Sequence, residues 1–154
     1  MSTIPLPYLL VFHYVEPLFA TLGALQALLS PGALVHMSLP SISYTPALRP
    51  LFTQLAGSWL MFAFHDAVTL RIYRDDVRIW RHILGAAILS DVGYTASLVQ
   101  SMGWEWFLNP LRWDLVNGFT ILSTVGPLVA KVLFVLGVGV PGDRKLGKKG
   151  RKKE

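Results

Sequence analysis

The sequence predicts an all-α membrane protein: a four-transmembrane-helix bundle with both termini in the cytosol. Three observations predict this fold class. The chain has 154 residues, of which 53% are hydrophobic and only 15% are charged, whereas about a quarter of the residues in an ordinary soluble domain are charged. Four segments are long and apolar enough to cross a bilayer. Most of the charged residues lie between or after these segments.

The composition excludes several other classes of protein. A chain without cysteine has neither a disulfide framework nor thiolate chemistry, and a chain so rich in apolar residues is not disordered. The net charge of +5 arises at the C-terminal end, because seven of the fourteen Lys and Arg residues lie between Arg144 and Lys153. A nearly neutral, apolar body with a basic tail indicates a lipid bilayer, and no nucleic acid, as the partner.

The four spans follow from the length that a bilayer demands, since a core of about 30 Å needs about 20 apolar residues in a helix. We predict helices at residues 8–29, 51–70, 82–102 and 116–140, which form a transmembrane domain over residues 1–140. Residues 141–154 are predicted to be a basic cytosolic tail. The first span is predicted to be a retained helix and not a signal peptide, because no Lys or Arg precedes Arg49 and its apolar stretch is too long.

Helix breakers and interface residues mark the connectors. Ser30-Pro31-Gly32 ends the first helix, and we expect ordered turns from there to residue 50. The second connector, residues 71–81, is short and highly charged. Tryptophan, which is enriched at membrane–water interfaces, occurs beside the second and third connectors as Trp80, Trp104, Trp106 and Trp113.

The distribution of basic residues predicts the orientation. With four spans, the N-terminus, the second connector and the tail lie on one side, which then carries eleven basic residues. The other side carries only Arg49 and Arg112. Basic residues are enriched on the cytosolic side of membranes, so both termini are predicted to be cytosolic. The final RKKE resembles a dilysine-type retrieval signal, which predicts the endoplasmic reticulum as the location.

Only four residues of the types Asp, Glu, Lys and Arg lie within the predicted spans: Glu16, Asp66, Asp91 and Lys131. An ionisable side chain inside a membrane is costly, so each is a functional candidate. At 1.5 Å per residue, Glu16, Asp91 and Lys131 all lie about 12–14 Å below the cytosolic surface. If the helices bring them together, we expect them to line a cavity that opens toward the cytosol.

Carboxylate acid–base chemistry is the chemistry that these residues favour. One lysine cannot neutralise both Glu16 and Asp91, so we expect one of the two to carry a proton, and such a pair separates acid from base. We predict Glu16 and Asp91 as the catalytic pair. The predicted supporting groups are His65, Asp66, Tyr94 and Lys131. Pro17 also frees the backbone carbonyl of His13, which then needs a polar partner at this depth.

Structural interpretations of the same residues stay open. Lys131 can pair with Glu16 or Asp91 simply to hold the bundle together, or it can extend toward the headgroups. Asp66 can pair with Arg71 or Arg74 at its helix end, and Tyr94 can belong to the core. No phosphate-binding loop and no HExxH motif is present, and the four histidines are scattered. We therefore expect no metal and no cofactor.

Several stretches together resemble a small four-helix integral-membrane family of filamentous fungi: LPYLLVFHYVEPLFATLGA, LAGSWLMFAFHDAVTLRIYRDDVRIW, ILSDVGYTASLV and FVLGVGV. The resemblance extends to about Val140, and its most specific parts are Glu16-Pro17 and Asp91-Val92-Gly93. Most members of that family have no assigned activity, and some occur in secondary-metabolite gene clusters. Relatives in aurovertin- and citreoviridin-like polyene-polyketide pathways are treated as hydrolases acting on epoxidised polyenes. Tyr94 stands where the resemblance leads us to expect histidine.

The resemblance implies a membrane-bound epoxide hydrolase or cyclase of fungal secondary metabolism. Its substrate would be an epoxidised polyketide, a lipophilic small molecule that arrives through the bilayer. Two alternatives stay open: cyclisation or isomerisation of a terpene, meroterpenoid or sterol-like substrate by the same carboxylates, and a non-enzymatic membrane protein of the endoplasmic reticulum.

Overall fold

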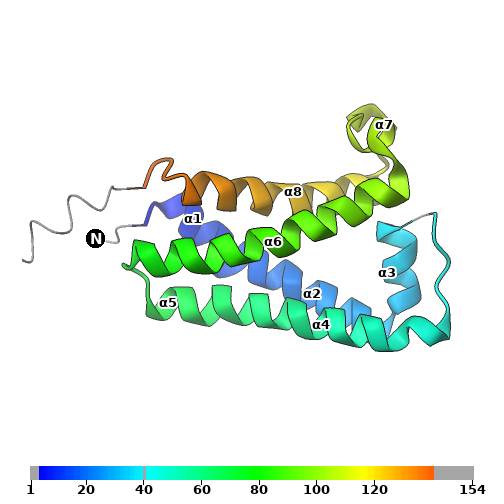
Figure 1. Ribbon diagram of the computed structural model, residues 1–154, viewed down its shortest axis with the longest axis horizontal. Coiled ribbons are helices and arrows are strands. Elements are labelled where there is room, and N and C mark those ends of the chain that lie inside the picture. Colours follow the sequence, from blue (N-terminus) through cyan, green and yellow to red (C-terminus); the bar gives the residue numbers. More distant parts are fainter. Residues whose placement is uncertain (1–3, 40, 141–154) are drawn as a thin grey trace, which may run out of the picture.

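The computed structural model describes residues 4–39 and 41–140, and within them every regular element is helical. Four long rods run along a common axis (Figure 1). The first rod joins α1 (Leu6–Leu10), the π-helical η1 (Val11–Val15) and α2 (Glu16–Leu29). The second joins α4 (Arg49–Phe64), the π-helical η3 (His65–Thr69) and α5 (Leu70–Ile72). The other two are α6 (Val77–Met102) and α8 (Leu115–Val135). The predicted all-α class is confirmed.

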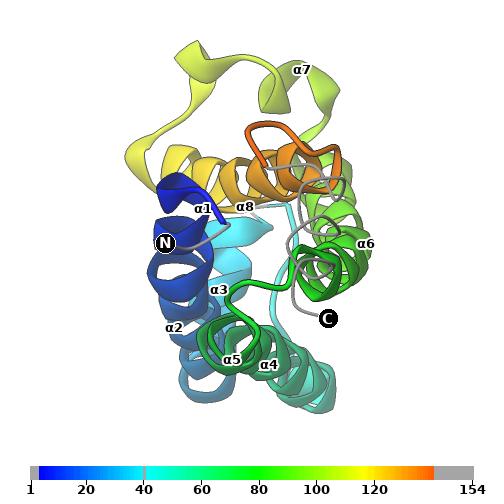
Figure 2. The same ribbon diagram turned by 90° about the vertical axis from the view of Figure 1, so that its left-hand side faces the viewer.

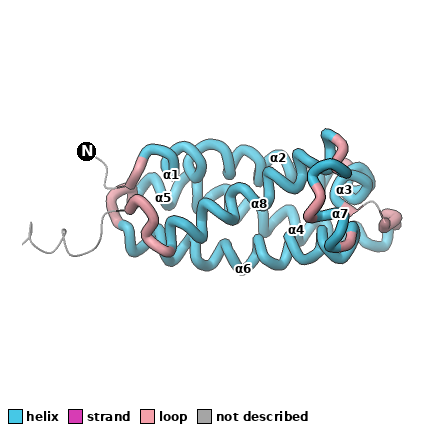
Figure 3. Tube along the Cα trace, turned by 90° about the horizontal axis from the view of Figure 1, so that it is seen from above, coloured by secondary structure: helices cyan, strands magenta, loops and turns pink. Residues whose placement is uncertain are grey.

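The connectors place short helices at one end of the bundle. The first connector holds α3 (Pro31–Ser38) and the 3-10 turn η2 (Pro46–Leu48), and the third holds α7 (Trp104–Phe107) and the 3-10 turn η4 (Pro110–Arg112). Figure 3 shows α3 and α7 at the same end, opposite the N-terminus. Our expectation of turns alone is wrong for residues 31–38, because Pro31 takes a first-turn position in α3, where its missing N–H leaves no hydrogen bond unmade.

Two helix ends differ from the predicted ranges for local reasons. Helix α6 begins at Val77, because the Asp76 carboxylate caps it and accepts hydrogen bonds from two backbone amides of its first turn. Helix α8 ends at Val135, since Gly137 and Gly139 adopt positive φ angles of 82° and 70° that a continuing helix does not allow. The predicted basic tail, with its retrieval-like ending, lies outside the described residues.

The outer surface of the bundle is that of a membrane protein. Among the described residues, three helices are long and apolar enough to cross a membrane: Leu6–Leu29, Val77–Met102 and Leu115–Val135. Leucines cover their outward faces, and examples such as Leu18, Leu22, Leu89 and Leu122 are all more than half exposed. Exposed apolar surface of this extent is stable only against lipid or a partner. The chain is therefore a multi-pass integral membrane protein in a bilayer environment.

The interior is packed differently in its two halves. At the end that holds the N-terminus, large side chains fill the space between the rods, including the fully buried Phe12, Trp80 and Phe134. In the other half, α2 packs against α4 through the small Ala24, Ala27 and Ala56 (Figure 2). Trp80, which follows the second connector, is enclosed in the core, and its Nε1 donates to the Tyr73 carbonyl at 3.1 Å.

Candidate functional site

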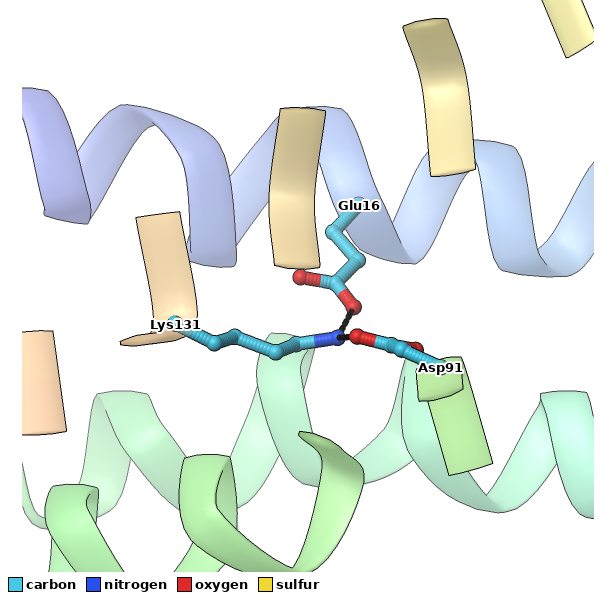
Figure 4. A network of polar contacts seen from close by, with 3 residues as sticks. All are labelled: Glu16, Asp91 and Lys131. Atoms are coloured by element: carbon cyan, nitrogen blue, oxygen red, sulfur yellow. Dashed lines mark hydrogen bonds and ion pairs between the residues drawn. The ribbon is translucent and has the colours of Figure 1, made fainter. Parts of the chain in front are cut away.

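Lys131 lies at the centre of the bundle between two carboxylates from different helices (Figure 4). Its Nζ donates a hydrogen bond to Asp91 Oδ2 at 2.7 Å and a second, shorter one to Glu16 Oε1. The lysine side chain is 1% exposed, so the alternative in which it extends toward the headgroups is wrong. The structure thus brings together Glu16 of α2, Asp91 of α6 and Lys131 of α8.

The position of Glu16 depends on an interruption of its helix. Glu16 is the first residue after the π-helical η1, and Pro17 follows it. Because proline has no N–H, the carbonyl of His13 lacks its helical donor. Arg71 supplies the missing donor from the second rod, with Nη2 at 2.6 Å from the His13 carbonyl oxygen. The prediction that this carbonyl needs a polar partner is confirmed.

Arg71 is also held by an aromatic ring, since its guanidinium lies 4.9 Å from the centre of the Tyr14 ring. This arginine therefore connects the second rod to the π-helical η1 of the first. The alternative in which Arg71 forms an ion pair with Asp66 is not what the structure shows.

A cavity of about 220 Å³ begins at the two carboxylates. Glu16 and Asp91 line it, whereas Lys131 lies behind them and does not. Its walls combine aromatic, hydroxyl and small side chains from α2, α3, α4, α6 and α8. The aromatic lining is Phe19, Trp59, Phe62, Tyr94 and Phe119, and the hydroxyl lining is Ser38, Ser90, Thr120, Ser123 and Thr124.

The cavity extends in the direction opposite to the one we expected. It runs from the carboxylates toward α3, whose Leu34, Met37 and Ser38 line its far part. The prediction that it opens toward the side of the basic second connector is wrong. The reason is side-chain volume, because large aromatic residues fill the half of the bundle near that connector, while Ala20 and Gly23 leave room in the other half.

Tyr94 forms part of the cavity wall one turn beyond Asp91. Its hydroxyl donates to Ser38 Oγ of α3 at 3.3 Å, and its ring meets Trp59 edge-to-face with the ring centres 5.7 Å apart. Tyr94 therefore connects the short helix α3 with the long helices that carry the carboxylates.

The two remaining candidates, His65 and Asp66, both belong to the π-helical η3, but they differ in whether they reach the cluster. Asp66 is 3% exposed and lies within electrostatic reach of Glu16, Asp91 and Lys131. Its Oδ2 has no hydrogen-bond partner. The described contacts of His65 are with its own helix: the ring lies beside Phe64, and Nδ1 lies 3.2 Å from Thr69 Oγ1. The structure brings Asp66, and not His65, to the cluster.

Sequence reasoning missed the cavity walls. Trp59 and the hydroxyls of α8 were not among the predicted residues, although one signal could have revealed the α8 hydroxyls. Thr120, Thr124, Pro127 and Lys131 recur every three or four residues and so share one face of a helix. The Thr120 and Thr124 hydroxyls donate to carbonyls of their own helix at 2.9 Å and 2.8 Å. Their oxygen lone pairs remain free to accept hydrogen bonds from a ligand.

The arrangement is suited to acid–base chemistry on an apolar molecule. Two carboxyl groups face one cavity and share one ammonium behind them, so they stay close together without both having to be ionised. Within residues 4–39 and 41–140 no group of three or more His, Asp or Glu side chains is placed to hold a metal ion. The fold and the site together define a multi-pass membrane protein with a buried Glu–Lys–Asp ion-pair cluster at the base of a mostly apolar cavity.

Comparison with known proteins gives the family. The chain belongs to the family described as a domain of unknown function, DUF7704, which matches residues 1–141. Part of the chain is similar to the Na(+)/H(+) antiporter NhaA 2 of Frankia alni, with 38% identity over 87 residues. That match covers 54% of this chain and only 17% of the antiporter. No solved structure matches the chain.

Proposed function

We propose that this chain is a membrane-bound enzyme that opens an epoxide on a lipophilic intermediate by carboxylate acid–base catalysis. One observation carries the proposal: Glu16 and Asp91, from different helices, line the same cavity and share Lys131. A purely structural ion pair needs only one carboxylate for each ammonium, and it needs no cavity beside it.

The charges at the site give the two carboxyl groups different roles, one as general acid and the other as general base. Inside an apolar bundle, Lys131 balances one carboxylate, and the other is most stable when it carries a proton. The protonated carboxyl donates to the epoxide oxygen as the carbon–oxygen bond breaks. The ionised carboxylate removes a proton from water, or from a hydroxyl of the substrate, as that oxygen attacks the epoxide carbon. Each such transfer typically contributes about 10²–10⁴-fold in rate.

The cavity supports a long, apolar substrate that carries oxygen. Five aromatic side chains offer flat apolar surfaces, and the hydroxyls of α8 offer acceptors for substrate hydroxyl groups. The resemblance to fungal membrane hydrolases suggests the finer assignment: an epoxidised polyene polyketide of fungal secondary metabolism. The product is a diol when water attacks and a cyclic ether when an internal hydroxyl attacks.

The proposed setting is the endoplasmic reticulum, with four spans and cytosolic termini. Three helices meet the length and hydropathy needed for a span. We include the rod from Arg49 to Ile72 as the fourth because it lies beside α2 along the same axis. The eleven basic residues of the second connector and tail then share one side.

The test is conversion of an epoxidised polyene by the purified protein in nanodiscs. Glu16→Gln and Asp91→Asn should each lower kcat/KM by about 10²-fold or more, as expected for loss of a general acid or base. Glu105→Gln is the matched control, because Glu105 is exposed on α7, outside the cavity. Wild-type rates in both site variants would refute the assignment.

Isotopic labelling identifies the nucleophile. Product formed in ¹⁸O-labelled water gains the label when water opens the epoxide. It gains none when an internal hydroxyl attacks, or when the chain cyclises or isomerises a terpene-like substrate.

The antiporter similarity favours a second candidate, proton-coupled cation exchange through the same buried carboxylates. Proteoliposomes loaded with a pH-sensitive dye test this candidate directly. A sodium gradient should drive proton movement in wild type and not in Glu16→Gln. The absence of any sodium-dependent signal, together with epoxide conversion, would leave the enzyme as the function.

A further inference from the structure

The proposed reaction leaves the site in the wrong state for a second turnover. The carboxyl that gave its proton to the epoxide is ionised, and the carboxylate that took one from the nucleophile is protonated. A proton must therefore pass between Glu16 and Asp91 before the next substrate reacts. Large buried side chains, among them Phe12, Trp80 and Phe134, close the bundle interior on one side of these groups. The product occupies the cavity on the other side.

Lys131 is placed to carry this proton. Its Nζ is hydrogen-bonded to Glu16 Oε1 and to Asp91 Oδ2 at the same time, and these two contacts are its only described polar contacts. The lysine does not line the cavity, so a bound substrate leaves it in place behind the carboxyls. An ammonium has three N–H donors on one rotatable nitrogen, so two of them can face two acceptors.

We propose that Lys131 returns the proton from one carboxyl to the other and so resets the site for each turnover, an inference that rests on the proposed function. One N–H bond of the ammonium breaks, and an O–H bond forms on the carboxylate that has given up its proton. The O–H bond of the other carboxyl breaks, and a new N–H bond forms on Lys131. The lysine begins and ends as an ammonium, so the step needs no co-reactant and no bulk water.

A purely structural lysine predicts something different. In that case any permanent cation that fits between the two carboxylates serves equally well. Arginine keeps the positive charge and its hydrogen bonds but does not lose a proton in proteins. Lys131→Arg therefore separates the charge of this residue from its ability to transfer a proton.

The experiment compares single and multiple turnovers in nanodiscs. With enzyme in excess, Lys131→Arg should still open about one equivalent of epoxide for each enzyme, because the first turnover needs no proton return. With substrate in excess, it should show one fast turnover and then slow by about 10²-fold, the lower range for loss of a positioned proton-transfer group. Thr95→Val is the matched control, because it removes a buried hydroxyl from α6 outside the cavity and should behave as wild type.

A second variant covers the case in which arginine does not fit. Lys131→Ala removes the side chain beyond Cβ, and n-propylamine has the length of the missing part. Added propylamine should restore repeated turnover, whereas tetramethylammonium, with the same charge and no N–H, should not.

The outcomes separate this inference from the function on which it rests. Repeated wild-type turnover by Lys131→Arg, or equal rescue of Lys131→Ala by both cations, overturns the role of Lys131 and leaves epoxide opening intact. A wild-type protein that opens no epoxide in either regime overturns the proposed function and this inference with it. A burst in Lys131→Arg, or rescue by propylamine alone, supports the proton return.

Discussion

Removal of the Lys131 charge should destabilise the bundle strongly. In Lys131→Met the apolar stem is kept, but Glu16 and Asp91 lose their shared ammonium in a site where they are 12% and 23% exposed. Breaking a buried ion pair by removing one partner typically costs about 3–5 kcal/mol. Both carboxyl groups lose a hydrogen bond to this one lysine, and one of them loses its counter-charge, so we expect a loss at the upper end of that range.

The assay is reversible unfolding in mixed micelles, followed by circular dichroism. The triple variant Lys131→Met, Glu16→Gln, Asp91→Asn should recover most of the lost free energy, because it leaves no uncompensated charge in the bundle. Thr95→Val should stay within about 0.5 kcal/mol of wild type, since its hydroxyl has no partner to lose. If the triple variant were no more stable than Lys131→Met, the loss would come from packing, and our electrostatic reasoning would be refuted.

Three further predictions concern the surroundings of the cluster. Arg71→Met leaves the His13 carbonyl without its donor, so we expect a loss of about 1–3 kcal/mol in the same unfolding assay; an unchanged midpoint would contradict this. Gly23→Ala places a Cβ 3.1 Å from the Trp59 ring, so the cavity wall must shift, and KM for the epoxide should rise with little change in kcat. Tyr94→Phe removes the hydroxyl contact with α3, worth about 0.5–1.5 kcal/mol, so amide hydrogen exchange in α3 should accelerate while that in α6 stays the same.

Much of the fold could be predicted because its signals are local. A long apolar run indicates a membrane helix whatever its neighbours are, and proline and glycine mark where helices end. The expectation of turns after the first helix failed because the same residue can end one helix and begin another. Pro31 ends α2, but it also starts α3, because a missing N–H is harmless in the first turn of a helix.

The candidate site was predictable in its membership but only partly in its geometry. Glu16, Asp91 and Lys131 could be selected from the sequence because ionisable groups are rare in apolar spans. Trp59 and the α8 hydroxyls could not be selected so easily, because aromatic residues and small hydroxyls are common in any membrane helix. The exclusion of His65 depends on the rotation of one π-helical turn, which points its ring toward Thr69.

The sequence by itself determined that this chain is helical, that it lies in a membrane and that it carries a few ionisable groups at similar depth. These properties depend on residue types and their spacing along one chain segment. Only the tertiary structure decided that one lysine joins two of the three acids, and that their cavity runs toward α3. Those facts depend on how each helix is rotated and on which half of the bundle has the smaller side chains. Both are settled by the packing of several helices at once, and no single segment encodes them.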